Sequence, residues 1–136
     1  MEIVLIRHGA TAGNIEKRYI GTTDEPLCDT GTAQIHEYMS DRCYPQVQAL
    51  YVSPLKRCSQ TAAFIYPDMK QIIVQDFREC DFGKFEGKNY KELTGNPQYQ
   101  QWIDSNGLKY SVKYTTTSGT YGNVVSCDYS EGTSVP

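Results

Sequence analysis

The chain of 136 residues holds two histidines, and one of them, His8, stands between Arg7 and Gly9 at the end of an apolar run. An imidazole can act as a nucleophile or as a general base, although an isolated histidine is as often a hydrogen-bonded structural group. The adjoining guanidinium favours an anion, and glycine allows a ligand to approach the backbone. Asn14 adds a polar donor one loop later. This order of residue types favours chemistry on a small anionic substrate.

A second cationic residue, Arg57, occurs in the stretch SPLKRCSQTA. Most arginines are solvated surface charges. Arg57, however, lies in the first turns of a helix expected directly after the strand at 48–52. Helix N-termini attract anions, and arginine binds phosphate oxygens through two N–H groups at once. Arg57 is therefore a candidate phosphate ligand, whereas Ser53 fits best as the cap of that helix.

The stretch RECDFGKFEGK carries three carboxylates. Glu79 follows the strand expected at 71–75 by a few residues, which places it at the edge of a sheet where ligands bind. It is the first candidate for a general acid, and a structural role as a loop carboxylate is the alternative. Asp81 and Glu86 compete with it for the same role.

The elements that must position these residues alternate between strand and helix. Ile3 to Ile6 predicts a short buried parallel strand, because it is a continuous apolar run rich in β-branched residues. Capping and helical spacing predict helices that start at Asp29 and Ser53, the first with Ile35, Met39 and Cys43 on its inner face. This alternation predicts an α/β fold. The remaining expected elements are strands at 48–52 and 71–75, an end of the second helix near Tyr66, and helices at 90–94 and 97–103.

The composition changes after Gly107. Among the 29 residues from 108 to 136, 17 are Thr, Ser, Tyr or Gly, and no helical stripe is present. We expect an α/β domain over residues 1–107. Residues 108–136 are expected to be a divergent tail, either a hairpin around Ser118-Gly119 or a disordered segment.

Composition also excludes several classes of protein. A net charge of −3 and a pI near 5.3 argue against a nucleic-acid binder. No apolar run reaches the length of a membrane span, and the N-terminus MEIVLI lacks the features of a signal peptide. The five cysteines are odd in number and form no CxxC pair, so neither a zinc site nor a disulfide framework is expected. We therefore expect a cytoplasmic protein.

Three blocks, RHGATAGN, SPLKRCSQTA and RECDFGKFEG, resemble the histidine phosphatase superfamily in their order and spacing. The sequences RECDFGKFEGKNYKEL and NPQYQQWIDSNG are most similar to the α-ribazole-phosphatase-like branch. The resemblance covers about residues 1–107. It implies a three-layer α/β/α fold like that of the phosphoglycerate mutases, with a mostly parallel central sheet.

The resemblance also implies a role for each candidate residue. His8 would be the nucleophile and form a phosphohistidine, while Arg7, Asn14 and Arg57 would bind the phosphoryl oxygens. Glu79 would protonate the leaving oxygen. Partial burial would keep the carboxyl group of Glu79 protonated until then. Two nearby guanidiniums would keep the imidazole neutral by like-charge repulsion and would stabilise the transferring phosphoryl group. Neither a metal ion nor an organic cofactor is implied.

The sequence departs from the family in one respect. Members carry a second histidine after a late strand, in a Ser-His-Gly context, and His36 does not match that position. We hypothesise that the chain after Gly107 is a frameshifted or truncated product of a longer member. Loss of that histidine would weaken catalysis, and an incomplete sheet edge predicts a homodimer.

The resemblance implies a phosphomonoester hydrolase that acts on a small phosphorylated substrate and is similar to the α-ribazole-5'-phosphate phosphatases. One alternative is phosphoryl transfer as in phosphoglycerate mutases, although the short connection from Phe85 to Gln98 favours hydrolysis. The other alternative is an inactive phosphate-binding remnant.

Overall fold

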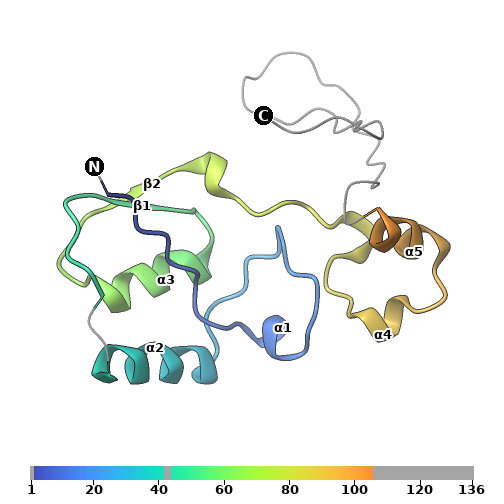
Figure 1. Cartoon of the computed structure of the whole chain (residues 1–136), viewed down its shortest axis with the longest axis horizontal. Coiled ribbons are helices and arrows are strands. Elements are labelled where there is room, and N and C mark those ends of the chain that lie inside the picture. The colour runs from blue at the N-terminus through green and yellow to red at the C-terminus, as the bar shows by residue number, and fades with distance from the viewer. Residues whose placement is uncertain (1, 42–43, 106–136) are drawn as a thin grey trace, which may run out of the picture. The chain divides into compact units, whose positions relative to one another are not determined.

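The computed structural model describes residues 2–41 and 44–105 (Figure 1). The chain divides into two compact units, Met1–Asn89 and Tyr90–Pro136. The first unit carries every residue for which the sequence predicts a role in catalysis or phosphate binding. Its described elements are α1 (Ala12–Ile15), α2 (Asp29–Asp41), β1 (Leu50–Val52), α3 (Lys56–Ile65), β2 (Gln71–Ile73) and the 3-10 turns Gln75–Phe77 and Gly83–Phe85.

The centre of the first unit is a β–α–β arrangement. Strands β1 and β2 pair in parallel, with Leu50 opposite Gln71 and Val52 opposite Ile73. Parallel strands need a crossover, and α3 supplies it. Helix α3 packs on β1 and against α2. The α/β class is therefore confirmed, and the small core lies between these elements, where the buried side chains are Ile35, Val52, Leu55, Ala62 and Ile65.

Both strands are shorter than the sequence predicts. Strand β1 begins at Leu50 instead of Gln48, and β2 ends at Ile73 instead of Gln75. One further ladder bond follows, from the Val74 N–H to the Val52 carbonyl oxygen over 2.9 Å. The chain then turns at Gln75–Phe77, so β2 delivers the Glu79 loop two residues earlier than expected.

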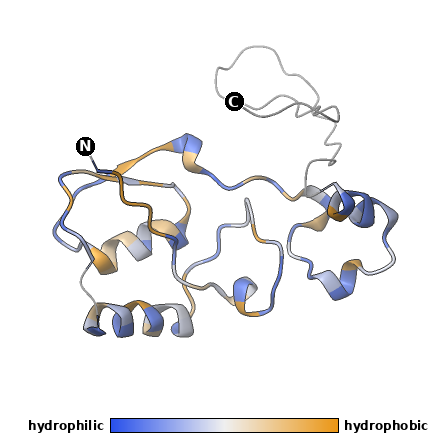
Figure 2. Cartoon of the chain, viewed as in Figure 1, coloured by the Kyte–Doolittle hydropathy of each residue, from blue (hydrophilic) through white to orange (hydrophobic). Residues whose placement is uncertain are grey.

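The predicted strand at Ile3 to Ile6 is not formed. These residues have no assigned strand, and the side chains of Ile3 and Leu5 are 72% and 92% exposed. A buried parallel strand needs hydrogen-bonded neighbours, and neither β1 nor β2 pairs with this segment in the described part of the chain. Figure 2 shows it as an orange, hydrophobic trace.

Helix α2 confirms the expected helix but not its cap. The Thr32 N–H donates to the Cys28 carbonyl oxygen over 2.9 Å, so Cys28 precedes the first turn and Asp29 already belongs to it. Ile35 is buried as expected, whereas Met39 is 37% exposed. Cys43, the third residue of the predicted stripe, lies outside the described residues.

Helix α3 begins at Lys56, later than the predicted start at Ser53. The Ser53 hydroxyl instead accepts the Leu55 N–H over 3.4 Å, which caps a turn before the helix. Leu55 takes the N-cap position and makes no side-chain hydrogen bond there. The first helical turn therefore starts closer to Arg57 than the sequence suggests.

The second unit contains α4 (Tyr90–Leu93) and α5 (Pro97–Asp104), which confirms both helices expected there. Asn96 caps α5, because its side-chain oxygen accepts the Gln98 N–H over 2.9 Å. The predicted domain boundary after residue 107 and the predicted tail at 108–136 lie outside the described residues. None of the helices in the described ranges is long and apolar enough to cross a bilayer.

Candidate active site

His8 follows the N-terminal apolar segment and is half-buried. Its Nδ1 lies 2.7 Å from the carbonyl oxygen of Gly9. A carbonyl oxygen can only accept a hydrogen bond, so Nδ1 carries the proton in this contact. The neutral ring then keeps an unprotonated lone pair on Nε2, which is the form that a nucleophile needs.

The pKa of His8 is lowered from 6.5. Burial is the largest cause, and the Gly9 hydrogen bond opposes it; the positive charges of Arg57 and Arg7 lower the pKa further, while Glu79 raises it. These charges act on His8 because they lie near it. The structure therefore places Arg7, Arg57 and Glu79 close enough to His8 to shift its pKa, and the lowered pKa favours the neutral imidazole.

Arg57 is almost completely buried, with 2% of its surface exposed. Its Nη1 donates to the Thr23 carbonyl oxygen over 2.9 Å, and its Nη2 donates to the Gly21 carbonyl oxygen over 2.8 Å. The alternative of a solvated helix charge is therefore wrong. A guanidinium has five N–H donors, and these two contacts hold two of them on backbone carbonyl oxygens of the described residues.

Two residues join the His8 segment to α3. The Gly9 N–H donates to the Thr61 hydroxyl over 3.0 Å, and that hydroxyl donates to the Arg57 carbonyl oxygen over 2.7 Å. Thr61 is buried, and the sequence analysis did not single it out. Thr61 lies one turn after Arg57 on the same helix, and this spacing could have identified it from the sequence.

Gly9 lies close to α2 and to the residues just before it. A Cβ added there would lie 2.7 Å from the Ile35 Cδ1 and 3.1 Å from the Leu27 Cδ2. Glycine at this position lets the loop pack directly on α2, in addition to the ligand approach that the sequence predicts.

Asn14 lies on α1 and takes part in a capping box with Thr11. Its side-chain oxygen accepts the Thr11 N–H over 3.1 Å, and its own N–H donates to the Thr11 hydroxyl over 3.3 Å. The amide oxygen is thereby committed to the helix cap. Only the NH₂ group of this side chain is left as the donor that a phosphate site would need.

The three carboxylates of the 78–88 stretch differ in environment. Glu79 is exposed, so the expected partial burial is wrong; its Oε1 accepts the Cys80 N–H over 3.2 Å. Asp81 accepts the Gly83 N–H over 2.7 Å and closes a local turn. Glu86 accepts four hydrogen bonds, which hold it as a carboxylate. Its role is therefore not that of a proton donor, and the competition is between Glu79 and Asp81.

The second histidine of the chain does not join this site. His36 lies on α2, and its ring packs edge-on against Phe64 at 5.2 Å between centroids. It is not among the groups that shift the pKa of His8. Within residues 2–41 and 44–105 there is also no group of three or more His, Cys, Asp or Glu side chains that could hold a metal ion.

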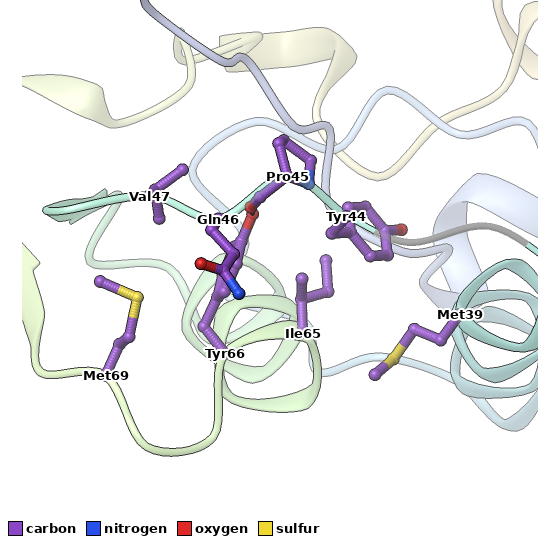
Figure 3. A pocket seen from close by; sticks show the side chains of 8 residues that line it. All are labelled: Met39, Tyr44, Pro45, Gln46, Val47, Ile65, Tyr66 and Met69. Atoms are coloured by element: carbon purple, nitrogen blue, oxygen red, sulfur yellow. Dashed lines mark hydrogen bonds between the residues drawn. The ribbon is translucent and has the colours of Figure 1, made fainter.

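A cavity of about 450 Å³ lies elsewhere in the first unit (Figure 3). It is formed where α3 ends and the segment before β1 begins, and the Tyr66 hydroxyl donates to the Pro45 carbonyl oxygen over 2.8 Å beside it. Its lining is mostly apolar and includes none of the predicted site residues. The lining residues are Met39, Tyr44, Pro45, Gln46, Val47, Ile65, Tyr66 and Met69.

Comparison with known proteins decides the family. The family model of the histidine phosphatase superfamily (branch 1) matches residues 3–117. This chain belongs to that superfamily. The match runs past Gly107, so the resemblance extends further into the compositionally distinct segment than the sequence analysis expects.

Individual members of the histidine phosphatase superfamily agree with this assignment. The uncharacterized phosphatase PhoE of Bacillus subtilis is 36% identical over 97 residues, which cover 68% of this chain and 49% of PhoE. A Yersinia pestis protein named "Probable phosphoglycerate mutase GpmB" is 32% identical over 105 residues, or 75% of this chain and 47% of GpmB.

The same fold is found among solved structures. An Escherichia coli protein described as "a putative alpha-ribazole-5'-P phosphatase" superposes with a TM-score of 0.64 at 26% identity, over 73% of this chain and 52% of that one. The fold is thus the α/β histidine phosphatase fold. The chain spans about half the length of the curated relatives that it matches.

Proposed function

We propose that this chain is a phosphomonoester hydrolase that works through a phosphohistidine on His8. The observation that carries the proposal is the state of that imidazole. Its Nδ1 proton is committed to the Gly9 carbonyl oxygen, and the charges of Arg57 and Arg7 together with burial lower its pKa. A neutral imidazole among guanidiniums can attack an anionic phosphoryl group that the same guanidiniums attract.

The reaction has two steps. In the first, the Nε2 lone pair of His8 bonds to phosphorus while the bond to the leaving oxygen breaks, and Glu79 supplies the proton that this oxygen takes up. In the second, water attacks the phosphohistidine, the P–N bond breaks, and Glu79 takes the proton of the water. Arg7, Arg57 and the Asn14 NH₂ group offset the charge on the phosphoryl oxygens in both steps.

The substrate class is a small phosphate monoester, and the structural relative named for α-ribazole-5'-P makes that type of substrate the first to test. Activity should be weak, because no residue of this sequence matches the second histidine of the family. Loss of one such preorganised phosphate donor costs about 10²–10³ in rate. The cytoplasmic location expected from the cysteine pattern remains part of this proposal.

The likeness to GpmB makes phosphoryl transfer to a second hydroxyl the other candidate reaction. Both reactions share the phosphohistidine and differ only in what accepts the phosphoryl group. The short connection from Phe85 to Gln98 favours water as the acceptor. An inactive remnant would bind phosphate without turning it over.

The first experiment is hydrolysis of an aryl phosphate between pH 5 and 7.5 by the whole chain and by His8→Ala. A Glu37→Gln variant controls for preparation, because Glu37 is an exposed residue of α2. Turnover that disappears in His8→Ala supports the proposal, and a phosphorus NMR signal of an acid-labile phosphoenzyme identifies the intermediate. Phosphate binding without turnover in folded wild-type protein would assign the chain to the remnant class.

The role of Glu79 needs a separate measurement. A general acid matters most when the leaving group is a poor one. Glu79→Gln should therefore slow hydrolysis of an alkyl phosphate by about 10²-fold and that of p-nitrophenyl phosphate far less. The same comparison for Asp81→Asn decides between the two carboxylates. An equal loss for both substrates in Glu79→Gln would remove it from the mechanism.

A further inference from the structure

Glu86 receives an unusual set of hydrogen bonds for a partly exposed carboxylate. Its Oε1 accepts three donors: the Gly21 N–H at 2.8 Å, the Thr23 N–H at 2.9 Å and the Thr23 hydroxyl at 2.7 Å. Its Oε2 accepts the Phe82 N–H at 3.1 Å. One side chain thereby ties residues 21–23 to the loop that carries Glu86 itself.

The opposite side of the same short segment holds Arg57. The carbonyl oxygens of Gly21 and Thr23 are the two acceptors of the Arg57 guanidinium. Glu86 and Arg57 therefore contact the same two residues, one through their N–H groups and the other through their C=O groups. Segment 21–23 thus lies between the two side chains, and it contains no helix or strand that would stiffen it.

We propose that Glu86 is a positioning residue that fixes the guanidinium of Arg57 by clamping segment 21–23. That Arg57 binds the phosphoryl group rests on the proposed function. The coupling of Glu86 to Arg57 through segment 21–23 rests on the described contacts alone. A planar guanidinium binds phosphate in a bidentate manner only when its plane is held, so a loose segment 21–23 would cost affinity without removing any ligand.

Segment 21–23 packs closely against the loop that carries Glu86. A Cβ added at Gly21 would collide with the Cys80 carbonyl and would lie 2.9 Å from the Phe82 Cδ2. The segment is thus pressed against the 80–86 loop at the point where Glu86 binds it. The pKa of Glu86 agrees: burial raises it, but the bonds from Thr23, Gly21 and Phe82 outweigh burial and the net shift is downward.

Two variants separate the clamp from general stability. In Glu86→Gln the side-chain oxygen can still accept from residues 21 and 23, but the NH₂ group then faces the Phe82 N–H, donor against donor. In Thr23→Val only the hydroxyl donor is lost, and the backbone contacts remain. Glu37→Gln makes the same chemical change as Glu86→Gln on the exposed face of α2 and serves as the matched control.

The first readout is the side-chain NMR signal of the Arg57 guanidinium in the whole chain, assigned by its absence in Arg57→Lys. We expect slow exchange of these protons in the wild type and in Glu37→Gln. Exchange should be about tenfold faster in Glu86→Gln and faster to a smaller degree in Thr23→Val. Exchange in Glu86→Gln that equals the wild-type rate would overturn the proposal.

The second readout is the affinity for orthovanadate, a mimic of the transferring phosphoryl group. Glu86→Gln should bind it about tenfold more weakly in the wild-type background, and less than twofold more weakly in the Arg57→Lys background. An equal loss in both backgrounds would show that Glu86 does not act through Arg57. If the wild type itself fails to bind vanadate, the proposed function fails, and the guanidinium exchange still decides whether the clamp exists.

Discussion

The Gly9 N–H donates to the Thr61 hydroxyl over 3.0 Å, and this hydrogen bond connects the His8 loop to helix α3, which carries Arg57. The same hydroxyl donates to the Arg57 carbonyl oxygen. His8 and Arg57 are 49 residues apart in the sequence, and Thr61 is the shared contact through which their backbones are held together. The spacing between the His8 loop and the Arg57 helix therefore depends on the buried residue Thr61.

Thr61→Val removes the hydroxyl and keeps the shape of the side chain. We expect a loss of about 1–3 kcal/mol in the free energy of unfolding, because the Gly9 N–H is left without its acceptor. The rate of phosphate ester hydrolysis should fall as well, since His8 would be held less accurately relative to Arg57. Urea unfolding and steady-state kinetics measure the two effects.

Thr61→Ser is the matched control for this change. It keeps the hydroxyl and loses only a methyl group, so both hydrogen bonds can form. Its kinetics should stay close to those of the wild type, with a modest loss of stability. If Thr61→Ser is impaired as strongly as Thr61→Val, packing of the methyl group is the important feature and the bridging role is wrong.

Gly9→Ala tests why glycine follows the histidine. The new methyl group would meet the Cδ1 of Ile35 at 2.7 Å, so overpacking should cost about 1–3 kcal/mol in the free energy of unfolding. Ile35→Val removes that Cδ1 and should restore part of the loss when the two changes are combined. Thermal unfolding of the two single variants and the double variant gives the coupling energy. Purely additive losses would contradict the packing explanation.

Several parts of the fold could be predicted because local signals agree with the tertiary structure. The helix at 29–41 combines an apolar spacing with a plausible start, and the helix at 97–104 has both a cap at Asn96 and a proline in its first turn. The segment at 3–6 fails for the opposite reason. A run of β-branched residues favours a buried strand only where neighbouring strands can pair with it. Whether such neighbours exist depends on other segments, so the run alone cannot predict the pairing.

The site shows the same division. The alternation of elements predicts His8, Arg57 and Glu79 at one edge of a sheet. No strand forms before His8, yet the charges of Arg57 and Glu79 both act on its pKa. Burial could not be predicted: Arg57 is buried and Glu79 is exposed, the reverse of what their expected roles suggest. Both outcomes depend on irregular segments. Segment 21–23 is held by long-range hydrogen bonds to Arg57 and Glu86, which no local propensity announces. Segment 78–82 has no helix or strand that would fix the exposure of Glu79.

The exposed apolar residues of the first unit lead to a prediction about association. Ile3 and Leu5 are largely exposed, and Ile72 and Ile73 on β2 are 43% and 46% exposed. Unpaired strand edges and apolar surface favour self-association, so we predict a homodimer at high protein concentration. Leu5→Lys should shift the molecular mass measured by light scattering towards that of a monomer. A wild-type chain that is monomeric throughout the concentration range would refute the dimer.

The protonation of His8 gives the last prediction. Its pKa in the folded chain is below the ordinary value of 6.5. At a pH between the folded pKa and 6.5, the unfolded chain therefore binds more protons than the folded one. The contribution of neutral His8 to stability is therefore complete above pH 6.5 and is lost as the pH falls through the folded pKa. Proton NMR of the imidazole should give a midpoint below 6.5, and the acidic limb of kcat/KM should coincide with it. Arg7→Gln removes a charge that lowers this pKa, so both midpoints should move upward together. A limb that stays in place while the NMR midpoint moves would mean that another group controls the reaction.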